Sequence, residues 1–157
     1  MEPMKIAKPY VHIRTPHYGE MERCCDLARD NWGITPAERC REQFIEYWKG
    51  GKYAPTFFVA VDDEDKVMGF AAYARSMLMK GAFELIWIAV DPKHQGDGVG
   101  KALTEHRLAD ITEREGQMVL LVTQKPYYFM RFNFFKLHHI GNGWYLMIKL
   151  LTATVDI

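Results

Sequence analysis

Residues 83–103, which read FELIWIAVDPKHQGDGVGKAL, decide the fold of this chain. The first eight of them are mostly β-branched, aromatic or otherwise apolar and predict a strand. A glycine-rich loop, residues 94–100, leads from this strand into a helix that runs to about Glu115. Glycines let the backbone approach a ligand closely, and a helix N-terminus supplies unpaired N–H groups and a partial positive charge. We therefore expect a phosphate-binding loop at this junction.

The loop differs from two familiar phosphate-binding motifs. It contains Lys101 but lacks the first glycine and the hydroxyl residue of a P-loop, and Gly96, Gly98 and Gly100 lack the G-x-G-x-x-G spacing. The alternative is a glycine-rich turn without a ligand. So many glycines make this less favoured, because each glycine loses much conformational entropy when the chain folds. A nucleotide-phosphate domain of another kind is a further alternative.

The segments around this unit predict a mixed sheet with helices. Strands are expected at residues 11–14, 56–61, 67–74, 118–123 and 144–151, and helices at 19–32, from Thr35 to the Gly50 pair, and within 127–137. Thr35 is expected to be an N-cap with Pro36 at the first helical position. The strand at 118–123 is nearly all apolar, as in a strand covered on both faces. The element order β-α-α-β-β-β-α-β-α-β-β requires a parallel crossover only within residues 83–123.

Length and composition set the class of protein. The 157 residues form about one domain, 1–157, and the 48% hydrophobic content excludes a disordered chain. Lys+Arg 20 and Asp+Glu 20 cancel, so neither nucleic acid nor an anionic membrane is an expected partner. No apolar run is long enough for a membrane span. Cys24, Cys25 and Cys40 show neither disulfide nor zinc spacing, which predicts reduced cysteines, a cytoplasmic location and no metal.

Two segments resemble the GNAT N-acetyltransferase superfamily. Residues 88–103 are similar to its acetyl-CoA loop, whose pattern [Q/R]-x-x-G-x-[G/A] is met by Gln95, Gly98 and Gly100. Residues 126–134 are similar to its second segment, P-x-Y-Y-x-R-F-G-F, with Phe129 at the second tyrosine and Asn133 at the glycine. With the element order, the resemblance covers about residues 10–151.

The resemblance implies an α/β fold with a mostly antiparallel central sheet flanked by helices and a β-loop-α-β unit for acyl-CoA. It implies an N-acetyltransferase that moves an acetyl group from acetyl-CoA to a primary amine by direct attack in a ternary complex. The carried-over acetyl-CoA contacts are the strand residues Ile88 and Val90 and the loop residues Gln95, Gly96, Asp97, Gly98, Val99, Gly100 and Lys101. The strand's N–H groups would also hold the acetyl carbonyl.

Glu84 is the expected general base. A lysine-like amine has a pKa of about 10.4, so at neutral pH it must lose a proton before it can attack a thioester. Strand alternation places Glu84 on one face with Ile86, Ile88 and Val90. A carboxylate on an apolar face is unusual unless it is paired or functional, and Glu84 also resembles in position the catalytic glutamate of the histone-acetylating branch. The alternative is an edge glutamate that reaches solvent or pairs with an arginine.

Tyr128 is the candidate acid for the departing CoA thiolate. The family's tyrosine position is held by Phe129, which has no proton to donate, and Tyr128 is its nearest replacement. A helix turns about 100° per residue, so Tyr128 can point elsewhere. Because Pro126, Arg131 and Phe134 align with the family pattern, Phe129 falls at the tyrosine position, which slightly favours the loss of the catalytic acid. Such a loss raises the alternative of a non-enzymatic acyl-CoA-binding or sensing module.

The acceptor is not identified by the sequence. A small-molecule amine, a peptide N-terminus and a protein lysine all stay open, as does a homodimer. By resemblance, the wall of the acceptor site would come from the first two helices and the strand hairpin. The residues considered there are Trp32, Tyr47, Trp48, Tyr53, Phe70, Tyr73 and Arg75.

Overall fold

The computed structural model describes residues 10–151. Its strands are β1 (His12–Arg14), β2 (Thr56–Val61), β3 (Val67–Arg75), β4 (Ala82–Val90), β5 (Met118–Thr123), β6 (Phe135–Gly141) and β7 (Trp144–Leu150). Its helices are α1 (Met21–Trp32), α2 (Ile34–Lys49), α3 (Val99–Glu113) and α4 (Pro126–Met130), and short 3-10 turns precede α1 and α3. This element order confirms the order expected from the sequence.

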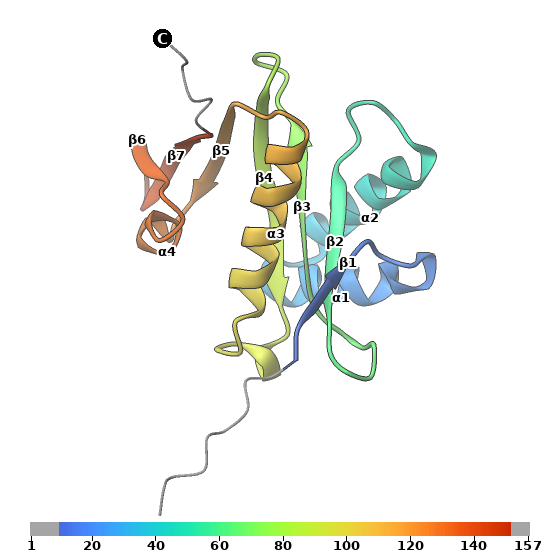
Figure 1. Cartoon of the computed structure of the whole chain (residues 1–157). Coiled ribbons are helices and arrows are strands. Elements are labelled where there is room, and N and C mark those ends of the chain that lie inside the picture. The colour runs from blue at the N-terminus through green and yellow to red at the C-terminus, as the bar shows by residue number, and fades with distance from the viewer. Residues whose placement is uncertain (1–9, 152–157) are drawn as a thin grey trace, which may run out of the picture.

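The strands form one sheet in the order β1-β2-β3-β4-β5-β7-β6 (Figure 1). Among the strands of residues 10–151, only β4 and β5 are parallel neighbours, so the single crossover there is the unit that contains the glycine-rich loop, as predicted. This parallel pairing is short: it joins Ala82, Phe83 and Glu84 to Met118, Val119 and Leu120. Beyond Glu84 the two strands no longer pair, and the facing edges of β4 and β5 are left open.

Two apolar clusters hold the helices on opposite faces of the sheet. One cluster lies on the α3 side and includes Phe58, Tyr73, Phe83 and Leu103. The other lies on the α1 and α2 side, where Phe44 is fully buried and stacks on Phe57 with ring centroids 3.8 Å apart. Apolar burial of this kind contributes about 25 cal/mol per Å² to folding stability. It holds α3, which follows the glycine-rich loop, and the helices α1 and α2, which contain the cysteines, against the sheet.

A bulge in β4 overturns one expectation. Ile86 lies opposite Ala72 and Ile88 lies opposite Ala71, so Trp87 is the additional residue, and its φ is 34°. A bulge shifts the alternation of side chains by one position. Ile88 and Val90 therefore pack in the α3-side cluster, whereas Ile86 packs on the other side. The prediction that Glu84 shares a face with Ile88 and Val90 is wrong, although Glu84 does share one with Ile86.

Two boundary expectations and one burial expectation also need correction. Helix α2 begins at Ile34 with Gly33 as its N-cap, so Thr35 is inside the helix and does not cap it. The aromatic segment expected as one helix is helical only to Met130, and β6 follows it. Val122 is 53% exposed, so β5 is not covered on both faces. In contrast, α2 ends at Gly50 in the left-handed conformation, as predicted.

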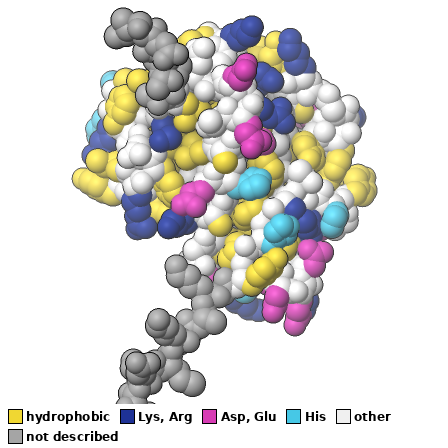
Figure 2. Space-filling view, viewed as in Figure 1, with side chains coloured by type: hydrophobic (Ala, Val, Ile, Leu, Met, Phe, Trp, Pro, Cys, Tyr) yellow, Lys and Arg dark blue, Asp and Glu magenta, His cyan; other side chains and the backbone are white. Residues whose placement is uncertain are grey.

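Charged side chains and cysteines differ in where they lie. Acidic and basic side chains are both spread over the face seen in Figure 2. Cys24, Cys25 and Cys40 are buried as free thiols. Within residues 10–151, no helix is long and apolar enough to cross a membrane. Over the same range, His, Cys, Asp and Glu side chains form no group of three or more that could hold a metal ion.

Candidate acyl-CoA site

The glycine-rich loop presents free backbone donors at the start of α3. Gly96 and Gly98 have φ values of 87° and 82°, and the space that a Cβ would occupy at each is open. The first helical hydrogen bond runs from the N–H of Ala102 to the carbonyl of Gly98. The N–H groups of residues 98–101 therefore precede the helical ladder. Together with the helix dipole, they suit the binding of a diphosphate.

The structure also shows which expected donors are already occupied. The Asp97 N–H donates to the His94 carbonyl at 3.2 Å, and the Gln95 N–H to the Pro92 carbonyl at 3.5 Å. The Asp97 carboxylate lies 3.4 Å from the His94 Nδ1 atom. Of the loop residues expected to contact acetyl-CoA, Gln95 and Asp97 therefore use their N–H groups within the loop, and the candidate donors are those of Gly96 and residues 98–101.

Asp91 fixes the loop at its beginning. Its carboxylate accepts a hydrogen bond from the Lys93 N–H at 3.0 Å and forms an ion pair with Arg23 of α1. The Lys93 N–H, and then Arg23, hold the pKa of the Asp91 carboxyl below its ordinary value. This acid therefore ties the end of β4 to α1 before the chain enters the loop.

Tyr128 of α4 reaches the loop. Its hydroxyl oxygen lies 3.0 Å from the position that a Cβ on Gly100 would occupy, and the Cδ1 atom of Ile88 lies 3.9 Å from the same point. Only a glycine fits here without moving the phenol. Burial raises the pKa of Tyr128, an effect that Thr104, Arg107 and Arg131 partly offset, so the phenol stays protonated at pH 7. The structure thus brings together Ile88, Gly100 and Tyr128.

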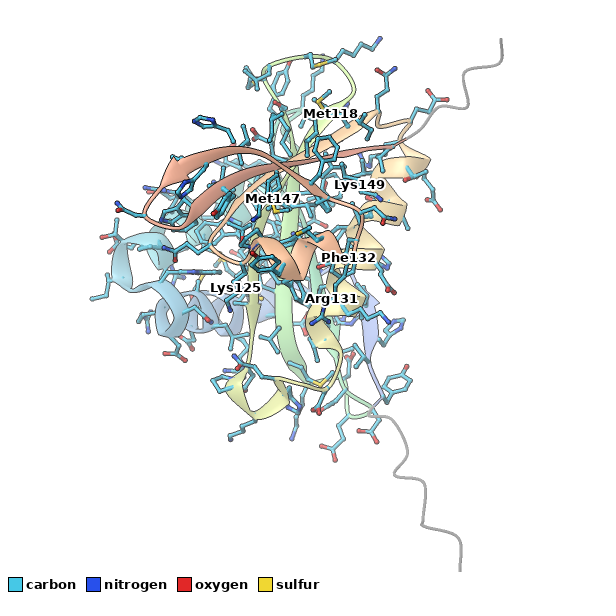
Figure 3. The ribbon with its side chains drawn as sticks, turned by 90° about the vertical axis from the view of Figure 1, so that its left-hand side faces the viewer. Met118, Lys125, Arg131, Phe132, Met147 and Lys149 are labelled. Atoms are coloured by element: carbon cyan, nitrogen blue, oxygen red, sulfur yellow. The ribbon has the colours of Figure 1, made fainter. Side chains whose placement is uncertain are left out.

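Phe129, the residue at the family's tyrosine position, points into the core. It is 8% exposed and lies in the α3-side cluster beside Phe134, with ring centroids 5.9 Å apart. The neighbouring Asn133 has φ 65°, a conformation that Asn tolerates better than most residues and that explains why it can stand at a glycine position. Lys149 of β7 donates to the Phe132 carbonyl at 2.8 Å and secures the end of α4 (Figure 3).

Glu84 lies at the end of the short β4–β5 pairing, half-buried on the α1 and α2 side. No hydrogen bond or ion pair of its carboxylate is found in the described part of the chain. The arginine-paired alternative is therefore absent there. Tyr128 lies on the α3 side, so the two candidate catalytic residues are on opposite faces of the sheet, at the place where β4 and β5 separate.

Two residues near the separation of β4 and β5 were not predicted from the sequence. Trp87, at the bulge, packs against Trp32 with ring centroids 5.5 Å apart and donates its Nε1–H to Gln43. Arg107 of α3 is 1% exposed and donates to carbonyl oxygens beside the bulge. No residue pattern near Trp87 predicts the bulge. Arg107, however, shares the helical stripe of Leu103 and Ile111, and an arginine in an apolar stripe is a readable signal.

The residues considered for the acceptor wall do not all lie together. Trp32 packs against Trp87, Trp48 packs against Phe44, and Tyr53 is exposed. Phe70 is fully buried in the core and cannot contact an acceptor. Tyr47, Tyr73 and Arg75 line a pocket at the end of α2, next to Gly50 and Arg114. Tyr73 is only 2% exposed, so the pocket reaches just a small part of it.

The comparisons with known proteins place the chain in a family. The model of the Acetyltransferase (GNAT) family matches residues 21–137, and the chain belongs to this family of acetyltransferases. The search of curated proteins gave no match.

Solved structures share the fold. One described as an acetyltransferase of the GNAT family from Desulfovibrio desulfuricans has a TM-score of 0.78 at 20% identity, with 91% of this chain and 100% of that chain covered. A GNAT N-acetyltransferase from Escherichia coli in complex with CoA gives 0.73 at 20% identity, with 96% and 86% covered. A GNAT acetyltransferase from Brucella melitensis in complex with acetyl-CoA gives 0.70 at 19% identity, with 92% and 90% covered.

The Asp91 carboxylate gives a pH prediction. Because its pKa is lowered in the folded state, the stability it contributes is complete above its unfolded pKa and is lost as the pH falls through the folded value. At pH 7 we expect the free energy of unfolding of the wild type to be larger than that of Asp91→Asn. This difference should decrease as the pH falls below about 4, where the carboxyl takes up a proton. Urea unfolding of both proteins from pH 3 to 7 measures this, and a gap that does not vary with pH would contradict it.

Proposed function

We propose that this acetyltransferase moves an acetyl group from acetyl-CoA to a primary amine by direct attack in a ternary complex. The observation that carries the proposal is the junction of Gly100, Ile88 and Tyr128, where the open donor loop, the unpaired edge of β4 and a protonated phenol meet. The ligands named for two of the similar structures, CoA and acetyl-CoA, support acetyl-CoA as the cosubstrate.

The diphosphate of acetyl-CoA would bind the free N–H groups of Gly96 and residues 98–101. The strand edge after Glu84, including Ile88 and Val90, has main-chain groups free to pair with the pantetheine arm, since β5 does not pair with it there. This direction leads from the loop toward Glu84. The thioester would then lie where β4 and β5 separate.

The positions of Glu84 and Tyr128 suit opposite proton transfers. The amine would approach from the α1 and α2 side, where Glu84 accepts its proton as the new C–N bond forms. The C–S bond breaks, and the CoA thiolate takes a proton from Tyr128 on the α3 side. Because the phenol is supplied by Tyr128, the phenylalanine at position 129 does not require a non-enzymatic module.

Substitutions at two glycines, one in the loop and one outside it, test the binding of acetyl-CoA. Acetyl-CoA at 100 times its dissociation constant should add about 2.7 kcal/mol to the free energy of unfolding. Gly98→Val should remove this gain, because a side chain would stand among the donors. Gly50→Val is the matched control: Gly50 also has a left-handed φ and open space, but it lies at the end of α2. An undiminished gain in Gly98→Val would contradict the site.

The base is tested by Glu84→Gln, which keeps the shape and removes the proton acceptor. With the best acceptor from an amine panel, followed by release of free thiol, the rate at pH 7 should fall by about 10²–10⁴. The loss should shrink as the pH approaches the pKa of the amine, because free amine needs no base. Glu46→Gln, on the exposed face of α2, is the control. Near-normal turnover of Glu84→Gln at pH 7 would show a structural glutamate.

The acid is tested by three aromatic variants. Tyr128→Phe should lower kcat by about 10²-fold with little change in acetyl-CoA affinity, since the ring is kept and the donor is lost. Tyr127→Phe should change nothing, because Tyr127 is 74% exposed. Phe129→Tyr should bring no gain, because its hydroxyl would enter the core. A silent Tyr128→Phe together with a faster Phe129→Tyr would instead show that the acid has been lost from this chain.

A further inference from the structure

Arg107 is a buried cation with an unusual set of partners. It is 1% exposed, and its guanidinium donates to the carbonyl oxygens of Ala72 at 3.0 Å, Ile86 at 3.0 Å and Trp87 at 3.4 Å. In the described residues it forms no ion pair with a carboxylate. A buried charge without a counter-ion is costly unless hydrogen bonds compensate it, and here neutral carbonyl groups do so.

These carbonyl groups belong to the bulge. Ala72 and Ile86 are the paired residues at which the register of β3 and β4 shifts, and Trp87 is the additional residue with φ 34°. Backbone in this region is strained for a tryptophan and persists only when its surroundings hold it. Arg107 satisfies carbonyl groups on both strands at once and so holds the bulge from the α3 side.

The same contacts act on specific amide groups. The Ile86 carbonyl and the Trp87 N–H belong to one peptide unit, and the Trp87 carbonyl and the Ile88 N–H belong to the next. A charged donor on a carbonyl oxygen polarises the peptide unit and strengthens its N–H as a donor. Both amides lie beyond Glu84, on the part of β4 that does not pair with β5.

We infer that Arg107 is a positioning residue for acetyl transfer: it fixes the bulge of β4 and polarises the Trp87 and Ile88 amides toward the thioester carbonyl. This inference rests on the proposed function, in which the strand's N–H groups hold that carbonyl. As negative charge develops on the carbonyl oxygen, polarised amides stabilise it more strongly. Burial lowers the pKa of Arg107 to about 9, so the side chain keeps its charge at pH 7.

Thr104 extends the same network to the phosphate loop. Its hydroxyl accepts from Arg107 Nη2 at 3.3 Å and donates to the Gly100 carbonyl at 2.8 Å. Arg107 and Thr104 together therefore connect the β4 bulge to the first turn of α3. A substitution at Arg107 is expected to affect the acetyl carbonyl through the Trp87 and Ile88 amides, and the loop through Thr104.

The test needs no knowledge of the acceptor. The infrared band of the thioester carbonyl in [1-¹³C]acetyl-CoA is measured free and bound to wild type, Arg107→Met, Arg107→Lys and Ile111→Ala. In wild type the bound band should move to lower frequency, because the carbonyl is hydrogen-bonded and polarised. Arg107→Met should return the band toward its free position, and Arg107→Lys should lie between them, since an ammonium cannot reproduce the planar fork.

Ile111→Ala controls for loss of packing, because Ile111 is fully buried on the same helix face and makes none of the bulge contacts. It should keep the wild-type band. With an acceptor in hand, Arg107→Met should lower kcat about tenfold at unchanged KM for acetyl-CoA, less than the 10²–10³ for deletion of a direct donor. If Arg107→Met does not fold, Arg107→Lys carries the comparison.

A wild-type band position in the folded Arg107 variant would overturn the inference and leave the proposed function standing. Absence of acetyl-CoA binding to wild type would overturn both. A band that shifts equally in Ile111→Ala and Arg107→Met would show that Arg107 contributes only packing.

Discussion

The hydrogen bonds from the buried Arg107 guanidinium to the bulge of β4 are the interaction on which the rest of this structure depends. They hold Trp87 at a positive φ, and the added residue turns Ile86 and Ile88 to opposite faces of the sheet. The pairing of β4 with β5 ends after Glu84. Beyond this residue, main-chain groups of the two strands do not pair with each other. In a regular strand Ile86, Ile88 and Val90 would share one face. Arg107, the bulge and the open edge of β4 thus lie together at the candidate site.

Around this opening the fold supplies three kinds of chemistry from three elements. The start of α3 gives N–H groups that precede the helical ladder, and α4 gives the protonated phenol of Tyr128. The first half of β4 gives the carboxylate of Glu84, for which residues 10–151 supply no hydrogen-bond or ion-pair partner. Tyr128 and Glu84 lie on opposite faces, so a nucleophile and a leaving group can be served without competing for one space. Lys149 and Asp91 do not line the opening, yet they fix α4 and the beginning of the loop. Family membership and this arrangement agree with each other.

Local sequence signals predict much of this fold. The glycines of residues 96–100, the apolar strand before them and the αL cap at Gly50 each express a backbone requirement that neighbouring residues decide. The element order and the single crossover follow from the same signals. The start of α2 was misplaced because Gly33 provides the break that Thr35 and Pro36 were expected to provide.

Tertiary contacts decide what the sequence could not. The bulge at Trp87 is contacted by Arg107, twenty residues further on, and strand alternation, which ignores such a bulge, put Glu84 on a face with Ile88 and Val90. The family pattern aligned Phe129 with a tyrosine, but only packing against Phe134 shows that this ring is in the core and that the Tyr128 hydroxyl reaches Gly100. The catalytic roles of Glu84 and Tyr128 stay predictions until their variants are measured.

The most direct measurement is a ¹H–¹⁵N NMR titration of the whole chain with acetyl-CoA. We expect saturable shifts of the amides of Gly96, residues 98–101 and residues 87–90, with little change at residues 50–54 beside the pocket at the end of α2. Shifts confined to that pocket, or a loop that stays unchanged at saturating acetyl-CoA, would contradict the account.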